Sequence, residues 1–465
     1  MLKKLALILG FVLLTCALSS CALFVEESDG FIFTVNGIGT CSVRGIEGYE
    51  YGDEVIIPPT SPRGLKVTEI SAYVVDGKYA KNVRHLIIPE NVKVINEYAF
   101  FSRYLSNVTT ITLPSTLEVL EDFWDPFYSN IRKVINNSDL QFDLDNNHGL
   151  SELQVVVGKD GEVTYLNTDT KEFFEIDDFL FGHYIKDDDG YVSGEYTLEA
   201  YLGTDQTIVL PKTVKGCEYT IHSMAGGKKV VIPEGKTEIN SSAFARGGVT
   251  HVTIPASVVE IGSRAFFFCD SLEKVVFTEG SQIKRIGPDA FYNCEELAYF
   301  NLPEGIEEID LSAFVSCPLL SSLNIPKSVK TIYPIEVLST YDNLHFKEIK
   351  VAEGNEYYKD IDGNLYNYDA TELIWYAWGK SQEKFVIPES VIRIGLNAFY
   401  KASSLTCVYI HEDVRYIERR AFGDCGSLTN VYYTGTEEKW ATILIESDNS
   451  YLMNATICFN YVPEE

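Results

Sequence analysis

The chain of 465 residues has little positive charge for its length. Its 38 lysine and arginine residues stand against 67 aspartate and glutamate residues, which gives a formal net charge of −29. If Lys3 and Lys4 are removed with an N-terminal targeting segment, 36 basic residues remain and the balance becomes −31. Because such a field repels phosphate backbones, the composition excludes a nucleic-acid-binding protein.

The sequence also lacks the spacings of common catalytic and metal sites. Its seven histidines are scattered, with no His-Glu-x-x-His pair, and no Gly-x-Ser-x-Gly turn occurs. Gly379-Lys380-Ser381 imitates the end of a phosphate loop, but Ile374 stands where its first glycine belongs. The acidic segments 143–147 and 187–190 do not fit the twelve-residue calcium loop. We therefore expect no catalytic residues, no cofactor and no metal site, and interpret Lys380 as a hairpin lysine.

Long apolar runs are absent after the N-terminus. Residues 5–18 form an apolar stretch that fits a signal peptide and is short for a spanning helix of about 20 residues. The sequence Leu18-Ser19-Ser20-Cys21 follows and resembles the lipobox of bacterial lipoproteins. This resemblance implies cleavage before Cys21, a lipid on its sulfur, and a chain held at the extracellular face of the cell membrane. The alternative is an ordinary signal peptide with an incidental cysteine.

What the sequence has is a repeat. The dipeptide Ala-Phe recurs in phase with Ile-Pro or Leu-Pro steps about ten residues earlier. The pairs begin at Ala99, Ala243, Ala265, Ala290, Ala313, Ala398 and Ala421. One such unit of about 23 residues cannot bury its apolar side alone, so neighbouring units must stack.

Each position in the unit has a physical reason. The alternation over residues 252–254 predicts a short strand with one buried face, and Pro255 ends its pairing because it has no N–H to donate. Gly262 suits a tight turn, and Ala265 is small because the backbone presses on the neighbouring coil. Phe266 fills the interior, and its stacked copies form an aromatic spine. The pattern predicts a solenoid of parallel coils.

The unit that follows resembles the repeat of the BspA-like (Treponema-type) leucine-rich-repeat family of bacterial surface proteins. The matching residues are Leu272, Val275, Phe277, Ile286, Gly287, Ala290, Phe291, Cys294 and Leu297. The resemblance implies a leucine-rich-repeat solenoid of short parallel β-strands with turns and short helical segments, capped at both ends. The expected order is a lipoprotein signal peptide (1–20), a tether (21–30), an N-terminal β-rich cap (31–82), a first repeat block (83–150), a β-rich insert (151–206), a second block (207–346), a hairpin excursion (347–384), the last coils (385–430) and a C-terminal cap (431–465).

Four cysteines fall four residues after a repeat alanine, at positions 269, 294, 317 and 425. Adjacent coils lie close enough for disulfides, but Cys294 has two equivalent neighbours and Ala402 occupies the same column without a thiol. We therefore predict mostly free, buried thiols that fill one column of the core.

Outward-facing strand positions are the expected binding residues. Five of them are candidates for ligand contact: His251, Lys274, Tyr299, Tyr409 and Tyr432. Solenoids bind through such extended faces, although tyrosine also favours exposed strands without any ligand. By resemblance, the function is non-catalytic binding at the cell surface, with adhesion to host or matrix proteins or to other cells. The alternative is a surface glycan-binding module of a polysaccharide-uptake system, which the tyrosines favour.

Overall fold

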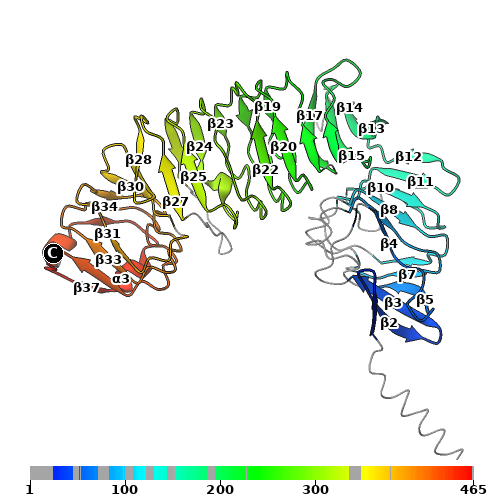
Figure 1. Cartoon of the computed structure of the whole chain (residues 1–465), viewed down its shortest axis with the longest axis horizontal. Coiled ribbons are helices and arrows are strands. Elements are labelled where there is room, and N and C mark those ends of the chain that lie inside the picture. Colours follow the sequence, from blue (N-terminus) through cyan, green and yellow to red (C-terminus); the bar gives the residue numbers. More distant parts are fainter. Residues whose placement is uncertain are drawn as a thin grey trace, which may run out of the picture. The chain divides into compact units, whose positions relative to one another are not determined.

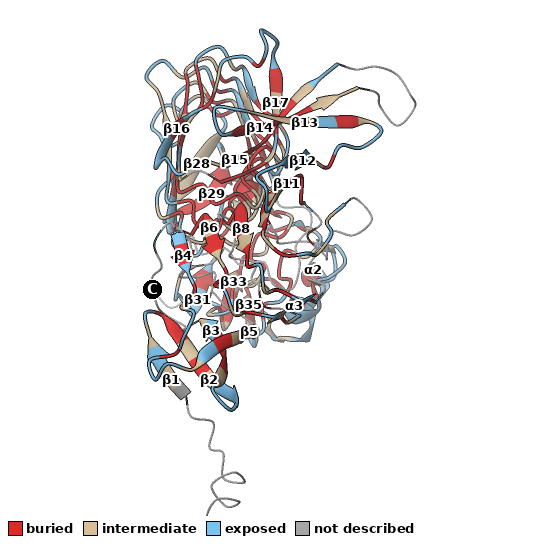
Figure 2. Cartoon of the chain, turned by 90° about the vertical axis from the view of Figure 1, so that its right-hand side faces the viewer, coloured by how far each residue is buried: buried red, intermediate tan, exposed pale blue. Residues whose placement is uncertain are grey.

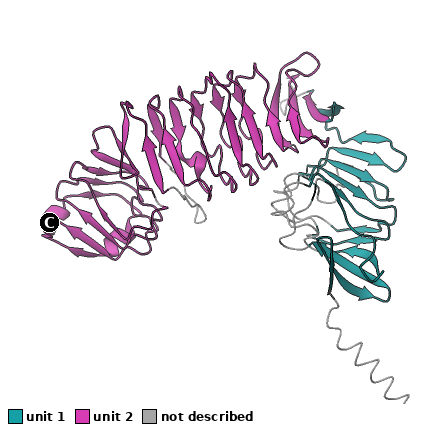
Figure 3. Ribbon diagram, viewed as in Figure 1, with its two compact units in different colours: residues 1–178, 185–192 teal, residues 179–184, 193–465 magenta. Residues whose placement is uncertain are grey.

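The computed structural model describes the greater part of the chain. The described residues are 25–45, 52, 54–71, 83–97, 99, 108–121, 130–143, 150, 152–185, 194–226, 228–334, 347–377 and 379–462. The chain divides into two compact units, residues 1–178 with 185–192 and residues 179–184 with 193–465 (Figure 3). The signal peptide, Cys21 and the acidic segment 187–190 lie outside the described residues.

The first unit contains two sheets. One has the order β1 (Val25–Ser28), β2 (Phe31–Gly37), β3 (Thr40–Gly45), β5 (Lys66–Ile70), β7 (Val94–Ile95) and β9 (Val119–Leu120). The other has the order β12 (Val163–Tyr165), β11 (Val155–Gly158), β10 (Lys133–Asn136), β8 (Thr110–Leu113), β6 (His85–Ile87) and β4 (Glu54–Ile56). The strand β13 (Lys171–Ile176) follows them in the chain.

Alternation along each strand builds the core of this unit. Leu86, Ile111, Val134 and Val156 occupy matching positions on four neighbouring parallel strands, and all four are buried. Figure 2 shows the buried residues of β6 and β8 within the body of the unit. The apolar residues of the repeat therefore face inward, as the period-two pattern predicts.

Several strand pairings extend across the expected segment boundaries. Val25–Ser28, within the expected tether, pairs antiparallel with β2. β4 pairs parallel with β6, and β5 pairs parallel with β3. Parallel pairing therefore begins before residue 83, the expected start of the repeats. In the expected insert, β11 continues the first array by pairing parallel with β10. A chain segment without the Ala-Phe signature can still supply a strand to a parallel ladder, because the ladder bonds are made by backbone groups.

The parallel strands of the second unit form two columns, and within each column the strands of successive coils lie next to one another (Figure 1). We call the first of them the first strand column: β16 (Thr207–Val209), β18 (Lys229–Val231), β20 (His251–Ile254), β22 (Lys274–Phe277), β25 (Ser322–Ile325), β27 (Glu348–Val351), β31 (Lys384–Val386), β33 (Cys407–Ile410), β35 (Asn430–Tyr433) and β37 (Thr456–Cys458). The second strand column contains β19 (Glu238–Ile239), β21 (Glu260–Ile261), β23 (Arg285–Ile286), β24 (Glu308–Asp310), β26 (Thr331–Tyr333), β30 (Glu372–Trp375), β32 (Arg393–Ile394), β34 (Tyr416–Ile417) and β36 (Leu444–Ile445).

Other elements complete the second unit. The strand β15 (Tyr196–Tyr201) pairs antiparallel with β14 (Phe179–Tyr184) and parallel with β17 (Tyr219–Ala225). The hairpin of β28 (Tyr358–Ile361) and β29 (Asn364–Asn367) turns at Asp362 and Gly363, whose φ angles are 49° and 72°. The short helices are η2 (Leu311–Phe314), α2 (Glu437–Trp440) and α3 (Ser450–Asn454). The solenoid with short parallel strands and few helical residues is confirmed.

The expected aromatic spine is present as an interior phenylalanine stack. Phe266 lies 5.1 Å from Phe244 and 5.1 Å from Phe291 between ring centroids, and the ring planes are nearly parallel. Phe399 and Phe422 repeat this arrangement in the last coils at 4.7 Å. All five rings are fully buried. The stack places one large apolar group per coil in the core, which is why the Ala-Phe dipeptide recurs.

Gly262 serves a different purpose from the one its sequence context indicates. Its φ angle is not in the left-handed region, so the turn itself does not require glycine. A Cβ atom at this position would lie 2.8 Å from the backbone nitrogen of Ser241 and 3.0 Å from the carbonyl oxygen of Ile239. The glycine is needed because the backbone of the preceding coil approaches too closely for any side chain.

Candidate binding surface

The middle of the first strand column brings two of the predicted residues together. His251 of β20 and Lys274 of β22 are direct partners in the parallel register. The His251 side chain is half-buried, with Nδ1 3.1 Å from the hydroxyl oxygen of Thr250, whereas Lys274 is exposed. Val252 points the opposite way and is buried, so the strand alternation directs the polar pair to solvent.

Tyr299 lies in the next coil, in a segment without assigned strand structure between β23 and β24. Its side chain is 80% exposed, while its neighbour Phe300 is buried and contacts Phe291 and Phe314. Phe300 therefore anchors this segment and leaves Tyr299 accessible on the surface.

The end of the column carries a cluster of three tyrosines. Tyr409 of β33 and Tyr432 of β35 are register partners whose rings stack at 4.9 Å with an angle of 14° between their planes. Tyr461, which follows β37, lies 5.3 Å from Tyr409 and 4.8 Å from Tyr432 between ring centroids. The structure thus joins two predicted tyrosines and adds a third, and it places them in different coils from His251, Lys274 and Tyr299.

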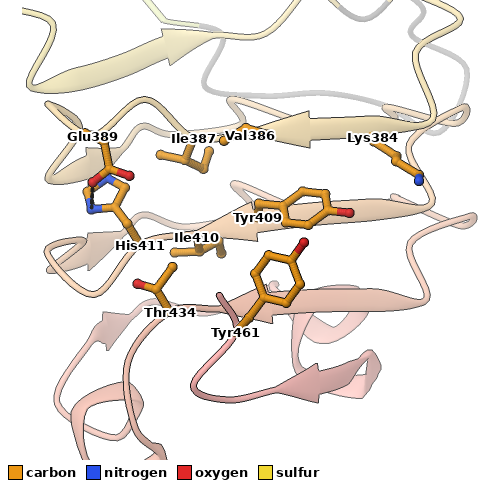
Figure 4. A pocket seen from close by; sticks show the side chains of 9 residues that line it. All are labelled: Lys384, Val386, Ile387, Glu389, Tyr409, Ile410, His411, Thr434 and Tyr461. Atoms are coloured by element: carbon orange, nitrogen blue, oxygen red, sulfur yellow. Dashed lines mark ion pairs between the residues drawn. The ribbon is translucent and has the colours of Figure 1, made fainter. Parts of the chain in front are cut away.

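An open hollow of about 320 Å³ lies beside this cluster, and we call it the terminal hollow. Its lining residues are Lys384, Val386, Ile387, Glu389, Tyr409, Ile410, His411, Thr434 and Tyr461 (Figure 4). Ile387 and Ile410 are buried and form its apolar part, whereas Val386 and Glu389 are 64% and 84% exposed. In Figure 4, Glu389 and His411 lie at one side of the hollow and Lys384 at the other.

The polar groups of the terminal hollow differ in how far they are already engaged. His411 is buried, with Nε2 2.9 Å from the carbonyl oxygen of Pro388, and its Nδ1 accepts from the backbone N–H of Asp413 at 3.3 Å. Glu389 lies 3.9 Å from the same ring and is otherwise exposed to solvent. A hydrogen bond with the Cys407 side chain, together with desolvation, raises the pKa of Tyr409 to about 12, so its hydroxyl stays protonated at neutral pH.

For most residues of the tyrosine cluster and the terminal hollow, the sequence gives only a weak indication of a binding role. Val386, Tyr409 and Tyr432 share one register position, which the repeat spacing reveals. His411 stands where the preceding coil has Pro388 of its Ile-Pro step, and Glu389 follows that proline, but neither position indicates a binding site by itself. Tyr461 lies beyond the last strand, so the sequence alone did not identify its contact with the other two rings.

The cysteines form a column of hydrogen-bonded thiols rather than disulfides. All eight cysteines of the described residues are free, and six of them are buried. The sulfur atoms of Cys269, Cys294 and Cys425 lie 2.9, 3.3 and 3.0 Å from the carbonyl oxygens of Phe244, Phe266 and Phe399 in the preceding coil. Burial raises the pKa of all three thiols, that of Cys425 to about 12. The prediction of free, buried thiols is confirmed for this column.

Lys380 lies after β30 and contacts the turn of the hairpin. Its ammonium group donates to the side-chain oxygen of Asn364 at 3.2 Å and also contacts the carbonyl oxygen of Asp362 in the turn. In the described part of the chain, no group of three or more His, Cys, Asp or Glu side chains is arranged to hold a metal ion. Among the helices that the structure describes, none has the length and apolar character needed to cross a membrane.

Comparisons with known proteins identify the family of the repeat. The family model described as BspA type leucine-rich repeat region matches six copies over residues 66–142, 218–336 and 375–444, more than half of the chain. No curated protein matches.

The solved structures that are similar to this chain include the following three. The pneumococcal vaccine antigen PcpA is 18% identical, with 88% of this chain and 72% of that chain covered and a TM-score of 0.30. A leucine-rich repeat protein from Eubacterium ventriosum is 19% identical, with 62% and 78% covered and a TM-score of 0.40. The leucine-rich repeat protein of T. pallidum is 20% identical, with 55% and 91% covered and a TM-score of 0.28. With its stacked coils, its interior phenylalanines and this family match, the chain belongs to the BspA-type leucine-rich repeat family.

Proposed function

We propose that the protein is a non-catalytic cell-surface protein that mediates adhesion to host or matrix proteins or to other cells. The single observation that carries this proposal is the aligned, solvent-facing first strand column, in which His251 and Lys274 are neighbours and after which Tyr299, in the next coil, is 80% exposed. An extended face of this kind contacts a partner over several coils, and exposed tyrosines are frequent anchors of protein interfaces.

The proposed location rests on the N-terminal segment. The lipobox-like sequence that ends at Cys21 supports a lipid anchor, with the solenoid on the extracellular side. Replacement of Cys21 by alanine is expected to move the protein from the membrane fraction of the producing cells to the soluble fraction. Wild-type protein that is found in the soluble fraction would contradict the anchor.

The adhesion proposal is tested by binding. The chain from residue 25 onward, which retains every described residue, is applied to immobilised matrix proteins and mucins at physiological and at high salt. We expect retention on at least one protein, with weaker retention at high salt because the surface carries a large net negative charge. Absence of retention on the whole panel would contradict the proposal.

A second candidate function is glycan binding within a polysaccharide-uptake system. The stacked rings of Tyr409 and Tyr432 beside an open hollow favour it, because aromatic rings pack against the apolar faces of sugars. The same panel extended to glycans tests this candidate separately from adhesion.

A further inference from the structure

The terminal hollow combines three kinds of surface within a small space. Its apolar part is formed by Ile387, Ile410 and the exposed side chain of Val386. Aromatic walls come from Tyr409 and Tyr461, and the hydrogen-bonding groups of Lys384 and Glu389 lie on opposite sides (Figure 4). Binding sites for small ligands have this composition, with a mostly apolar lining and a few polar groups that orient the ligand.

The aromatic walls are held in place before any ligand arrives. The ring planes of Tyr409 and Tyr461 meet at 54°, and Tyr432 packs against both rings, at 14° to Tyr409 and 53° to Tyr461. The backbone N–H of Tyr461 donates to the carbonyl oxygen of Tyr433 at 3.0 Å, which fixes the segment after β37 on the preceding coil. A ligand therefore loses little free energy to ordering these side chains.

The polar groups of the terminal hollow suit a ligand that carries many hydroxyl groups. The Glu389 carboxylate is 84% exposed and accepts hydrogen bonds, while the exposed Lys384 ammonium donates them. The Tyr409 hydroxyl is already hydrogen-bonded to the Cys407 side chain, and its oxygen can accept a further hydrogen bond. His411 and Thr434 are partly engaged, since Thr434 already accepts from the backbone N–H of Glu412 at 2.9 Å. A pyranose ring presents an apolar face to aromatic walls and hydroxyls around its edge, which matches this arrangement.

Charge selects among sugars. The chain carries a net charge of −29, and Glu389 places a carboxylate in the hollow itself. Both features disfavour sulfated, sialylated or phosphorylated glycans, because these negative groups are repelled by the negative charge of the protein. The single positive charge of Lys384 does not offset this repulsion. We propose that the terminal hollow binds a neutral pyranose unit of a glycan, an inference that rests on the second candidate function and deepens it.

The test uses the chain from residue 25 onward and defined probes. Binding of neutral cello-, malto-, manno- and galacto-oligosaccharides is measured by calorimetry, with sialyllactose and a heparin fragment as anionic probes. We expect at least one neutral probe to bind, and to bind equally well at low and high salt, because no ion pair is formed. Tyr409→Ala is expected to weaken that binding by about tenfold, since it removes one aromatic contact.

Further variants keep the result interpretable. Val386→Trp enlarges an exposed strand side chain and is expected to block the hollow without disturbing the core, and Tyr333→Ala, at an exposed tyrosine of the second strand column, serves as the matched control that retains binding. Binding of neutral probes that is unchanged in both Tyr409→Ala and Val386→Trp would overturn the assignment to this hollow while the glycan-binding function stands. Tighter binding of the anionic probes would overturn the choice of neutral sugars. Absence of any glycan binding would overturn both the inference and the second candidate function, and would leave the adhesion proposal to its own test.

Discussion

The middle coils (243–317) and the terminal coils (384–461) of the second unit have the same interior and different outward faces. In both, phenylalanine rings stack between coils and cysteine thiols contact the carbonyl oxygen of the preceding coil. The middle coils present His251, Lys274 and Tyr299 to solvent, whereas the terminal coils present Val386 and the three clustered tyrosines. The comparison teaches that the interior residues specify the coil, which leaves the outward strand positions free to carry different binding chemistry.

The largest expected effect comes from breaking the shared interior. Phe291→Ala is expected to lower the free energy of unfolding by about 3–5 kcal/mol, because it leaves a cavity in a close-packed core. The Phe291 ring contacts three other rings, those of Phe266, Phe300 and Phe314. The Phe422 ring stacks on that of Phe399, so the loss of stability in Phe422→Ala should lie at the lower end of the same range. Urea unfolding checks both variants, and a loss below about 1 kcal/mol for Phe291→Ala would show that the stack is not part of the stabilising core.

The next effect tests the close approach between coils. Gly262→Ala is expected to cost about 1–3 kcal/mol, because its Cβ would lie 2.8 Å from a backbone nitrogen. Gly426, in the terminal coils, is the matched control, since no atom lies within 4 Å of the corresponding Cβ and its φ angle is not left-handed. Thermal melts should therefore separate the two substitutions. Equal melting temperatures would mean that coil spacing does not explain Gly262.

A smaller effect concerns the thiols that both regions share. Cys294→Ala and Cys425→Ala are each expected to cost about 1 kcal/mol, because each removes one hydrogen bond to a buried carbonyl group. Cys217 is exposed, and Cys217→Ala should have no measurable effect. Thiol labelling of the native chain should modify Cys217 quickly and the two buried cysteines only after unfolding. Rapid native labelling of Cys294 would contradict the packed column.

The smallest expected effect is a difference in pH dependence between a carboxylate of the middle coils and a carboxylate that precedes the terminal coils. Hydrogen bonds from Lys284 and Lys330 lower the pKa of the half-buried Glu307 to about 2, so its stabilising contribution is present above about pH 4.5 and is lost as the pH falls towards 2. Burial raises the pKa of Glu372 in β30, which precedes the terminal coils, so its ionisation opposes folding as the pH rises through that pKa.

Two isosteric variants measure this contrast. Glu307→Gln should lower the melting temperature at pH 7 and have no effect near pH 2, whereas Glu372→Gln should raise it at pH 7 and have no effect at low pH. Melts between pH 2 and 7 check both directions, and a common pH profile for the two variants would refute the assigned causes.

Much of the interior could be predicted from the sequence, because repetition exposes residues that face the same environment in every coil. The Ala-Phe pairs predicted the stack, and Asp362-Gly363 predicted a two-residue hairpin turn. Arg264 and Phe268 adopt left-handed φ angles of 58° and 56° without the glycine or asparagine that would signal them. These conformations are imposed by packing between coils and have no local sequence signature.

The candidate sites likewise contain some features that the local sequence predicts and others that it does not. The outward direction of His251, Lys274, Tyr409 and Tyr432 follows from strand alternation, which is a local property. The contact of Tyr461 with two of these residues depends on how the chain folds back after β37, which no periodicity encodes. The terminal hollow therefore became visible only in the structure.

The central claim is that the outward residues of the middle coils, and not the interior, determine binding. The most direct test compares three chains for retention on the matrix-protein panel and for thermal unfolding. They are wild type, a variant with His251, Lys274 and Tyr299 replaced by alanine, and a control with Arg285→Ala and Tyr333→Ala in the second strand column. We predict equal melting temperatures, loss of most retention in the first variant and full retention in the control. Equal retention of all three chains, or no retention of the wild type, would contradict the claim.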